Sequence, residues 1–233
     1  MDKMAIFVEG QTEQIFAEKL VSEIAGRHRV HIDAIQAYGG SACQRTFVEV
    51  HATRPDPNKE FYVLIYDCMG ESRLLSDIRD QHPSLAAQGF SAIVGIRDVY
   101  PQLAAEIPTI RNDFTTFAPA GLPVPILVLG IMEIEAWFIA EHTHFERMHA
   151  SLTTATVIAH LGYDPSMHDV QVVPAPAADL RSVYSSAGLG YAKKRNQIER
   201  TVNRLDYALL YLSIRARIPD FDVLADCIDR FLS

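Results

Sequence analysis

Residues 5–13 read Ala5-Ile6-Phe7-Val8-Glu9-Gly10-Gln11-Thr12-Glu13 and join a short hydrophobic strand to the start of a helix. The four apolar residues predict a buried strand that delivers Glu9 to its carboxyl end. Gly10 permits a sharp turn, Thr12 can cap the following helix, and Glu13 suits the positive first turn. Sites in open α/β sheets gather at the carboxyl ends of strands, so Glu9 is a candidate site residue. The alternative is that Glu9 only hydrogen-bonds its own loop.

The same strand–helix pattern recurs through the first 141 residues. Hydrophobic strands are predicted at residues 5–8, 30–37, 61–66, 91–96 and 125–131, and helical segments at 12–26, 43–52, 74–88, within 102–123 and at 132–141. Short connections between such elements predict an α/β fold with a Rossmann-like, mostly parallel sheet of about four to five strands covered by helices.

The pattern changes beyond residue 141. Helical segments are predicted at residues 142–161, 179–184, 197–212 and 223–232, with a Pro-rich loop at 164–178. We therefore expect an α/β domain over residues 1–141 and a C-terminal helical lobe over residues 142–233, packed together as one structural unit.

Composition narrows the classes of function. The 233 residues carry a net charge of −8, which argues against a broad basic surface for nonspecific DNA binding. Cys43, Cys68 and Cys227 do not have the spacing of a disulfide framework or a zinc site. No apolar run reaches about 18 residues and no leader segment is evident, so we expect a cytoplasmic protein without membrane contact.

Acidic residues follow three of the predicted strands. Glu9, Asp67 and Asp98 stand at strand ends, and Glu71 lies four residues after Asp67. Carboxylates gathered at one edge of a sheet repel one another unless a cation neutralises them, and oxygen donors suit Mg²⁺ or Mn²⁺. Such metals usually serve phosphate chemistry. Each acid singly can instead be a helix N-cap.

Several motifs together resemble a known family. Residues Glu9-Gly10-Gln11-Thr12-Glu13 resemble the first motif of Toprim domains of the overcoming-lysogenization-defect type of nuclease. Tyr38-Gly39-Gly40 falls where that fold has a glycine after its second strand, and Asp67 falls where it has an acidic pair. Met132-Glu133-Ile134-Glu135-Ala136-Trp137 and Tyr191-Ala192-Lys193 resemble a related bacterial group often found beside ABC-type ATPases. The resemblance covers residues 4–100 as a fold and the whole chain more loosely.

The resemblance implies a metal-dependent phosphodiesterase that acts on nucleic acid, in phage defence or mobile-element systems, with an ATPase partner of the ABC type. It implies that Glu9 is the general acid or base and that Asp67 binds Mg²⁺. The family's second Asp is Met69 here, and a thioether is a poor Mg²⁺ ligand. Glu71 or Asp98 are the candidates to replace that ligand.

Other residues are candidates for substrate contacts. Lys193, with Lys194, predicts a phosphate clamp in a catalytic role, or else the solvated start of a helix. Gly39 and Gly40 allow backbone to approach a ligand. The remaining candidates, of lower rank, are the acidic residues Glu13, Glu133 and Glu135, and Trp137, which is either a core residue or a base-stacking platform.

Two other functions stay open. A non-catalytic adaptor or binding module would keep the fold but lack a metal, because Met69 breaks the acidic pair. A small-molecule nucleotide phosphohydrolase would use the same edge of the sheet. The sequence predicts neither the oligomeric state nor a choice between DNA and RNA.

Overall fold

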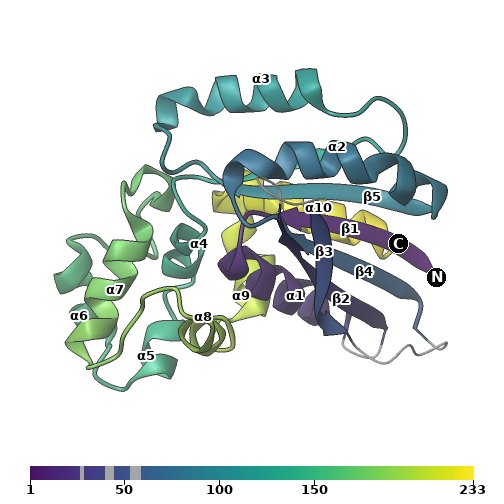
Figure 1. Ribbon diagram of the computed structural model, residues 1–233. Helices are drawn as coiled ribbons and strands as arrows, with labels where there is room; N and C mark the ends of the chain where they lie inside the picture. Colours follow the sequence, from purple (N-terminus) through teal and green to yellow (C-terminus); the bar gives the residue numbers. More distant parts are fainter. Residues whose placement is uncertain (27–28, 40–44, 53–58) are drawn as a thin grey trace. The chain divides into compact units, whose positions relative to one another are not determined.

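The computed structural model describes residues 1–26, 29–39, 45–52 and 59–233 (Figure 1). Its contacts divide the chain into two compact units. Unit 1 comprises residues 1–97, 105–128 and 223–233, and unit 2 comprises residues 98–104 and 129–222. Each unit is thus assembled from separate stretches of sequence, whereas the sequence analysis placed a single boundary at residue 141.

Within the described residues, six strands form one sheet. They are β1 (Asp2–Val8), β2 (Val30–Tyr38), β3 (Thr46–Ala52), β4 (Phe61–Asp67), β5 (Phe90–Asp98) and β6 (Ile126–Gly130), in the order β3-β2-β4-β1-β5-β6. Strand β1 pairs in parallel with β4 and β5, β2 pairs in parallel with β4, and β3 is antiparallel to β2. The prediction of a mostly parallel α/β sheet is confirmed, with more strands than expected.

The additional strand is β3, in a stretch for which the sequence analysis predicted a helix over residues 43–52. Residues 46–52 instead pair with β2, from Tyr38↔Thr46 to Asp33↔Ala52. The stretch contains Phe47, Val48 and Val50, residue types that favour a pleated strand once a neighbouring strand offers hydrogen bonds. Residues 43 and 44, the start of that predicted helix, lie outside the described residues.

The helices of unit 1 are α1 (Gln11–Ala25), α2 (Glu71–Ala87) and α3 (Ile107–Phe117), preceded by the short η1 (Ala104–Glu106). The predicted cap by Thr12 is wrong, because α1 begins one residue earlier and its N-cap is Gly10. Gly10 itself is extended (φ −167°), and Gly26 follows the last residue of α1 with a positive φ of 78°. Helix α2 is continuous and contains Pro83.

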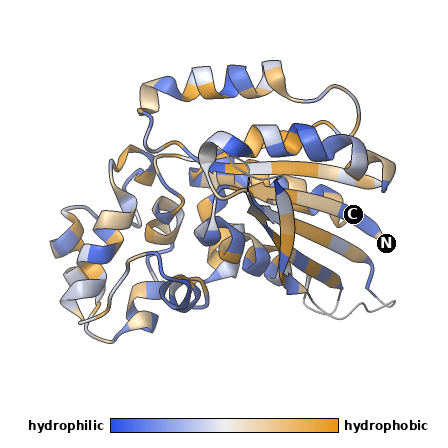
Figure 2. Cartoon of the chain, viewed as in Figure 1, coloured by the Kyte–Doolittle hydropathy of each residue, from blue (hydrophilic) through white to orange (hydrophobic). Residues whose placement is uncertain are grey.

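The two faces of the sheet in unit 1 pack against different helices. On one face, Phe7 and Tyr66 stack at 4.3 Å in a core that includes Leu74 and Ile78 of α2 and Phe114 of α3. Figure 1 shows α2 and α3 on that side and α1 across the sheet. Neighbouring side chains of a strand point to opposite faces. The central strands accordingly appear mostly in hydrophobic colours in Figure 2, whereas α3 carries both kinds of residue.

Unit 2 is helical, which confirms the prediction of a C-terminal helical region. Its elements are α4 (Glu135–Ala140), α5 (His144–Met148), α6 (Thr154–Leu161), η2 (Val170–Val172), α7 (Pro176–Ser186), α8 (Arg195–Val202), α9 (Tyr207–Leu212) and η3 (Ile214–Arg217), followed by α10 (Pro219–Phe231), which continues into unit 1. Trp137 is fully buried and packs on Phe221 at 5.3 Å, which supports its interpretation as a core residue. No helix in the described part of the chain is long and apolar enough to span a bilayer.

Candidate functional site

Three adjacent strands carry the predicted acidic residues. Val8 is the register partner of both Asp67 on β4 and Ile96 on β5. Glu9 follows Val8 and Arg97 follows Ile96, so the carboxyl ends of β4, β1 and β5 present these side chains together in unit 1. The expectation that the strands bearing these acids are parallel neighbours is therefore met.

Asp67 is held tightly at the end of β4. Its side chain has no exposed surface. Oδ1 accepts a hydrogen bond from the backbone N–H of Met69 at 2.9 Å, and Oδ2 accepts one from Nε2 of Gln36 at 2.9 Å. Burial raises the pKa of Asp67, and the two hydrogen bonds act in the opposite direction. Gln36 was not a candidate in the sequence analysis, since only strand pairing shows that it faces Asp67.

The turn after Asp67 connects the ends of β1 and β4. The N–H groups of Cys68 and Gly70 donate to the carbonyl oxygens of Val8 (2.9 Å) and Glu9 (2.7 Å). Met69 adopts a positive φ of 54° and its side chain is exposed. Glu71 is the first residue of α2, directly after Gly70, and its side chain lies outside the described part of the structure.

Glu9 is paired with a cation that the sequence analysis missed. Nε of Arg97 lies 3.5 Å from Oε1 of Glu9, and both side chains are mostly buried. The signal for Arg97 was its position after a hydrophobic strand, next to Asp98. Glu13 lies in the first turn of α1, as its position predicted, and its side chain is buried there.

A second cation in unit 1 fixes the start of β3. Arg45 donates through Nε to Oδ1 of Asp77 on α2 at 2.7 Å, and its Nη2 also contacts Oδ2 of that carboxylate. The same Nη2 donates to the carbonyl oxygen of Cys68 at 2.7 Å. Arg45 thereby ties β3 to α2 and to the turn after Asp67.

The predicted glycine loop is described only in part. Gly39 directly follows β2 and has a φ of 80°, a conformation that favours glycine. Gly40 lies outside the described residues. The predicted approach of this loop to a ligand therefore stays a prediction.

Asp98 ends β5 and contacts backbone in unit 2. Its Oδ1 accepts a hydrogen bond from the N–H of Ile134 at 2.8 Å. Gly130 makes room for this contact, since a Cβ there would lie 2.5 Å from Asp98 Oδ1 and 2.9 Å from Ile134 N. Asp98 thus stabilises the turn before α4 through this hydrogen bond. Its role as a metal ligand stays a prediction.

Three further predicted residues meet in unit 2. Nζ of Lys193 lies 3.0 Å from Oε1 of Glu133 and 3.1 Å from Oε1 of Glu135. The hydroxyl of Tyr191 donates to the same Glu135 oxygen at 2.9 Å. Burial raises the pKa of Glu135, as does the charge of Glu133, while Lys193 and Tyr191 oppose the shift. Burial lowers the pKa of Lys193, but the nearby carboxylates outweigh it and raise that pKa above its ordinary value.

Lys194 is placed differently from Lys193. It is the N-cap residue of α8, with φ −76° and ψ 143°, and it is exposed. The predicted alternative of a helix start is therefore met at Lys194 and at the first residue of α8, Arg195.

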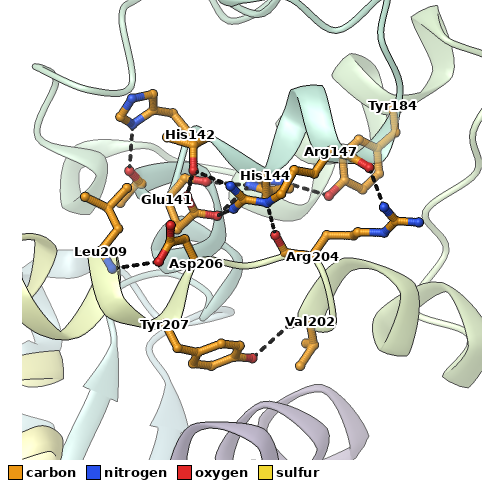
Figure 3. Close-up of polar contacts among 12 residues, drawn as sticks. Glu141, His142, His144, Arg147, Tyr184, Val202, Arg204, Asp206, Tyr207 and Leu209 are labelled. Atoms are coloured by element: carbon orange, nitrogen blue, oxygen red, sulfur yellow. Dashed lines mark hydrogen bonds and ion pairs between the residues drawn. The ribbon is translucent and has the colours of Figure 1, made fainter. Parts of the chain in front are cut away.

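Unit 2 also contains a buried polar network that the sequence analysis missed (Figure 3). Glu141 and His144 have no exposed surface, and Arg147 donates to Oε2 of Glu141 at 3.0 Å. His144 contacts the carbonyl oxygen of Glu141 through Nδ1 and the hydroxyl of Tyr184 through Nε2 at 2.8 Å. Burial lowers the pKa of His144 to about 3, so the imidazole is neutral at physiological pH.

The network is closed by a reciprocal contact. Arg147 donates to the carbonyl oxygen of Arg204 at 2.7 Å, and Arg204 donates to that of Arg147 at 2.9 Å. Because these side chains and carbonyl groups hydrogen-bond to one another, we interpret the network as a structural link between α5 and the segment before α9.

In the described ranges, no group of three or more His, Cys, Asp or Glu side chains is positioned to hold a metal ion. No protein-family model, no curated protein and no solved structure shows a significant match to this chain.

Proposed function

We propose that this protein is a Toprim-like phosphodiesterase that acts on nucleic acid with Mg²⁺ or Mn²⁺. The observation that supports the proposal best is the register of β4, β1 and β5, in which Val8 pairs with both Asp67 and Ile96. That register puts two carboxylates, Glu9 and Asp67, at one edge of the sheet together with the guanidinium of Arg97.

The side chains at this edge of the sheet offer oxygen ligands, the type that a hard divalent cation prefers. Asp67 and Glu9 offer carboxylate oxygens, and the hydrogen bond from Gly70 to Glu9 brings the start of α2, which begins with Glu71, beside them. Asp67 and Glu71 of unit 1 would hold the metal beside Glu9. A bound Mg²⁺ or Mn²⁺ supplies charge stabilisation on the phosphoryl oxygens.

The remaining chemistry is assigned to side chains of unit 1. Glu9, which follows β1 and whose Oε1 lies 3.5 Å from Nε of Arg97, would accept and return the proton. The guanidinium of Arg97, paired with Glu9, places positive charge where negative charge would develop on a phosphoryl group.

The experiment is a cleavage assay with the full chain. Plasmid DNA, single-stranded DNA and RNA are each incubated with Mg²⁺ or Mn²⁺ and with the wild type, Glu9→Gln or Glu146→Gln, the last being an exposed glutamate of α5. We expect cleavage by the wild type and Glu146→Gln, and a loss of at least about 100-fold with Glu9→Gln, typical of an acid–base group. Equal background from wild type and Glu9→Gln would refute the proposal.

A non-catalytic binding module is the second candidate, and one observation favours it. Both oxygens of the fully buried Asp67 already accept hydrogen bonds, and Met69 replaces the second acid. Calorimetric titration with Mn²⁺ separates the two candidates. Binding that Asp67→Asn abolishes supports the enzyme, whereas absence of binding and of cleavage supports the module.

A further inference from the structure

The segment Gly190–Arg195 of unit 2 concentrates positive charge in a chain of net charge −8. Lys193, Lys194 and Arg195 are consecutive and exposed. Two more cations hold the backbone that precedes them: Arg181 donates to the carbonyl oxygen of Tyr191 at 2.8 Å, and Arg200 donates to that of Gly190 at 2.5 Å. Five cationic side chains therefore belong to this segment or donate to its backbone.

Lys193 is the member whose position is fixed. Its Nζ lies between Glu133 and Glu135, as described above, and its backbone adopts a φ of 52°. A positive φ is unfavourable for a lysine, so the surrounding contacts must compensate for it.

The two carboxylates are themselves held. Oε2 of Glu133 accepts a hydrogen bond from the N–H of Ala177, in the first turn of α7, at 2.9 Å. Glu135 has no exposed surface and receives the Tyr191 hydroxyl, while its Oε2 has no hydrogen-bond partner among the described residues. The buried, incompletely satisfied carboxylate favours a nearby cation, which Lys193 supplies.

The ammonium group keeps one donor for a ligand. A lysine ammonium has three N–H groups, and within the described residues two carboxylate oxygens account for the contacts of this one. The Lys193 side chain is 37% exposed, so the third N–H can reach a molecule in solvent.

We propose that residues 190–195 form a phosphate-binding surface for the backbone of nucleic acid, with Lys193 as its fixed donor and Glu133, Glu135 and Tyr191 as positioning residues. The inference rests on the proposed function for the identity of the ligand. The five cations, Arg181, Lys193, Lys194, Arg195 and Arg200, outnumber the three carboxylates paired with them, Glu133, Glu135 and Glu199, and this excess of positive charge favours a polyanion over a neutral ligand.

Binding of a fluorescent single-stranded oligonucleotide at several salt concentrations is the test. Lys193→Met should weaken binding and reduce the slope of log K against log salt by roughly 0.7, the value for one phosphate contact on a single strand. Lys193→Arg should keep the wild-type slope, because arginine retains the positive charge. Lys19→Met, which removes a lysine of α1, serves as the control and should leave the slope unchanged. An unchanged slope in Lys193→Met would overturn the proposal.

A second measurement separates this inference from the proposed function. The ammonium of Lys193 is observed by ¹⁵N NMR, assigned through its loss in Lys193→Arg, while inorganic phosphate is added. We expect phosphate to shift this resonance in the wild type. In Glu135→Gln and Tyr191→Phe the resonance should broaden, because the Lys193 ammonium is held in place less firmly when a positioning residue is changed. A phosphate-induced shift without nucleic-acid cleavage would support the phosphate-binding surface and refute the proposed phosphodiesterase activity. A resonance that phosphate does not move rejects the surface, whatever the cleavage assay shows.

Discussion

Gln36 and Asp67 occupy matching positions on the parallel strands β2 and β4, and the Gln36 amide donates to Asp67 Oδ2 at 2.9 Å. Paired residues of neighbouring strands share a face, so this contact follows from the register. It supplies one of the two hydrogen bonds that compensate for the burial of the carboxylate.

Gln36→Leu should destabilise the protein by about 1–3 kcal/mol, since it leaves a buried carboxylate oxygen without its donor. Urea denaturation measures the free energy of unfolding. Gln88→Leu is the matched control, because Gln88 Nε2 also makes a 2.9 Å side-chain hydrogen bond, to Ser84, but on the exposed surface. We expect the control to change stability by less than about 0.5 kcal/mol. Similar losses in both variants would contradict the importance of burial at Asp67.

Gly130→Ala should destabilise by about 1–3 kcal/mol, because the new Cβ would lie 2.5 Å from Asp98 Oδ1 and 2.9 Å from Ile134 N. Gly10→Ala is the control at another strand end. Its backbone is extended and the nearest atom, Glu13 Oε2, would be 3.6 Å from the new Cβ. Thermal and urea unfolding should therefore show a clear loss of stability in Gly130→Ala and little change in Gly10→Ala. If Gly130→Ala is as stable as the wild type, the close approach of Gly130 to Asp98 and Ile134 is contradicted.

Arg45→Met should cost about 3 kcal/mol, because it leaves the buried carboxylate of Asp77 without its cation. The comparison is Arg195→Met, whose partner Glu199 is one turn away on α8 and equally exposed. That pair should contribute less than about 0.5 kcal/mol. If both variants lose the same stability in urea, the tie between β3 and α2 is weaker than the structure indicates.

His144 should make the protein acid-sensitive. Its pKa falls from 6.5 to about 3 on folding, so below pH 6.5 the unfolded state takes up a proton that the folded state does not. The contribution of His144 to the free energy of unfolding is therefore fully present above pH 6.5. It declines by about 1.4 kcal/mol per pH unit as the pH falls from 6.5 toward 3.

The test compares unfolding free energies at pH 7 and pH 5 in the wild type and in His144→Gln. The variant loses stability at both values but should show a pH dependence that is smaller by about 2 kcal/mol. Burial raises the pKa of Glu141, so acid favours the fold through that group, and this contribution is common to both proteins. An identical pH dependence in the two proteins would argue that His144 is protonated in the folded state.

Hydrophobic strands followed by helices were sufficient to predict the parallel strands β1, β2, β4 and β5 and the carboxyl-end position of Glu9, Asp67 and Asp98. The prediction for residues 46–52 was wrong, because a short, partly polar segment forms a strand only when β2 offers an antiparallel partner. Thr12 was a plausible cap from its residue type, but the hydrogen bond from Gln14 N–H to Gly10 O starts α1 one residue earlier.

Local sequence thus determined the alternation of strands and helices and placed acids after strands, since apolar periodicity and residue type are properties of neighbouring residues. Tertiary structure decided the partners. Gln36 meets Asp67 across 31 positions of sequence, Arg45 meets Asp77 across 32, and Lys193 meets Glu133 across 60. Strand order, burial and helix packing create these contacts, and each depends on parts of the chain that a local pattern does not include.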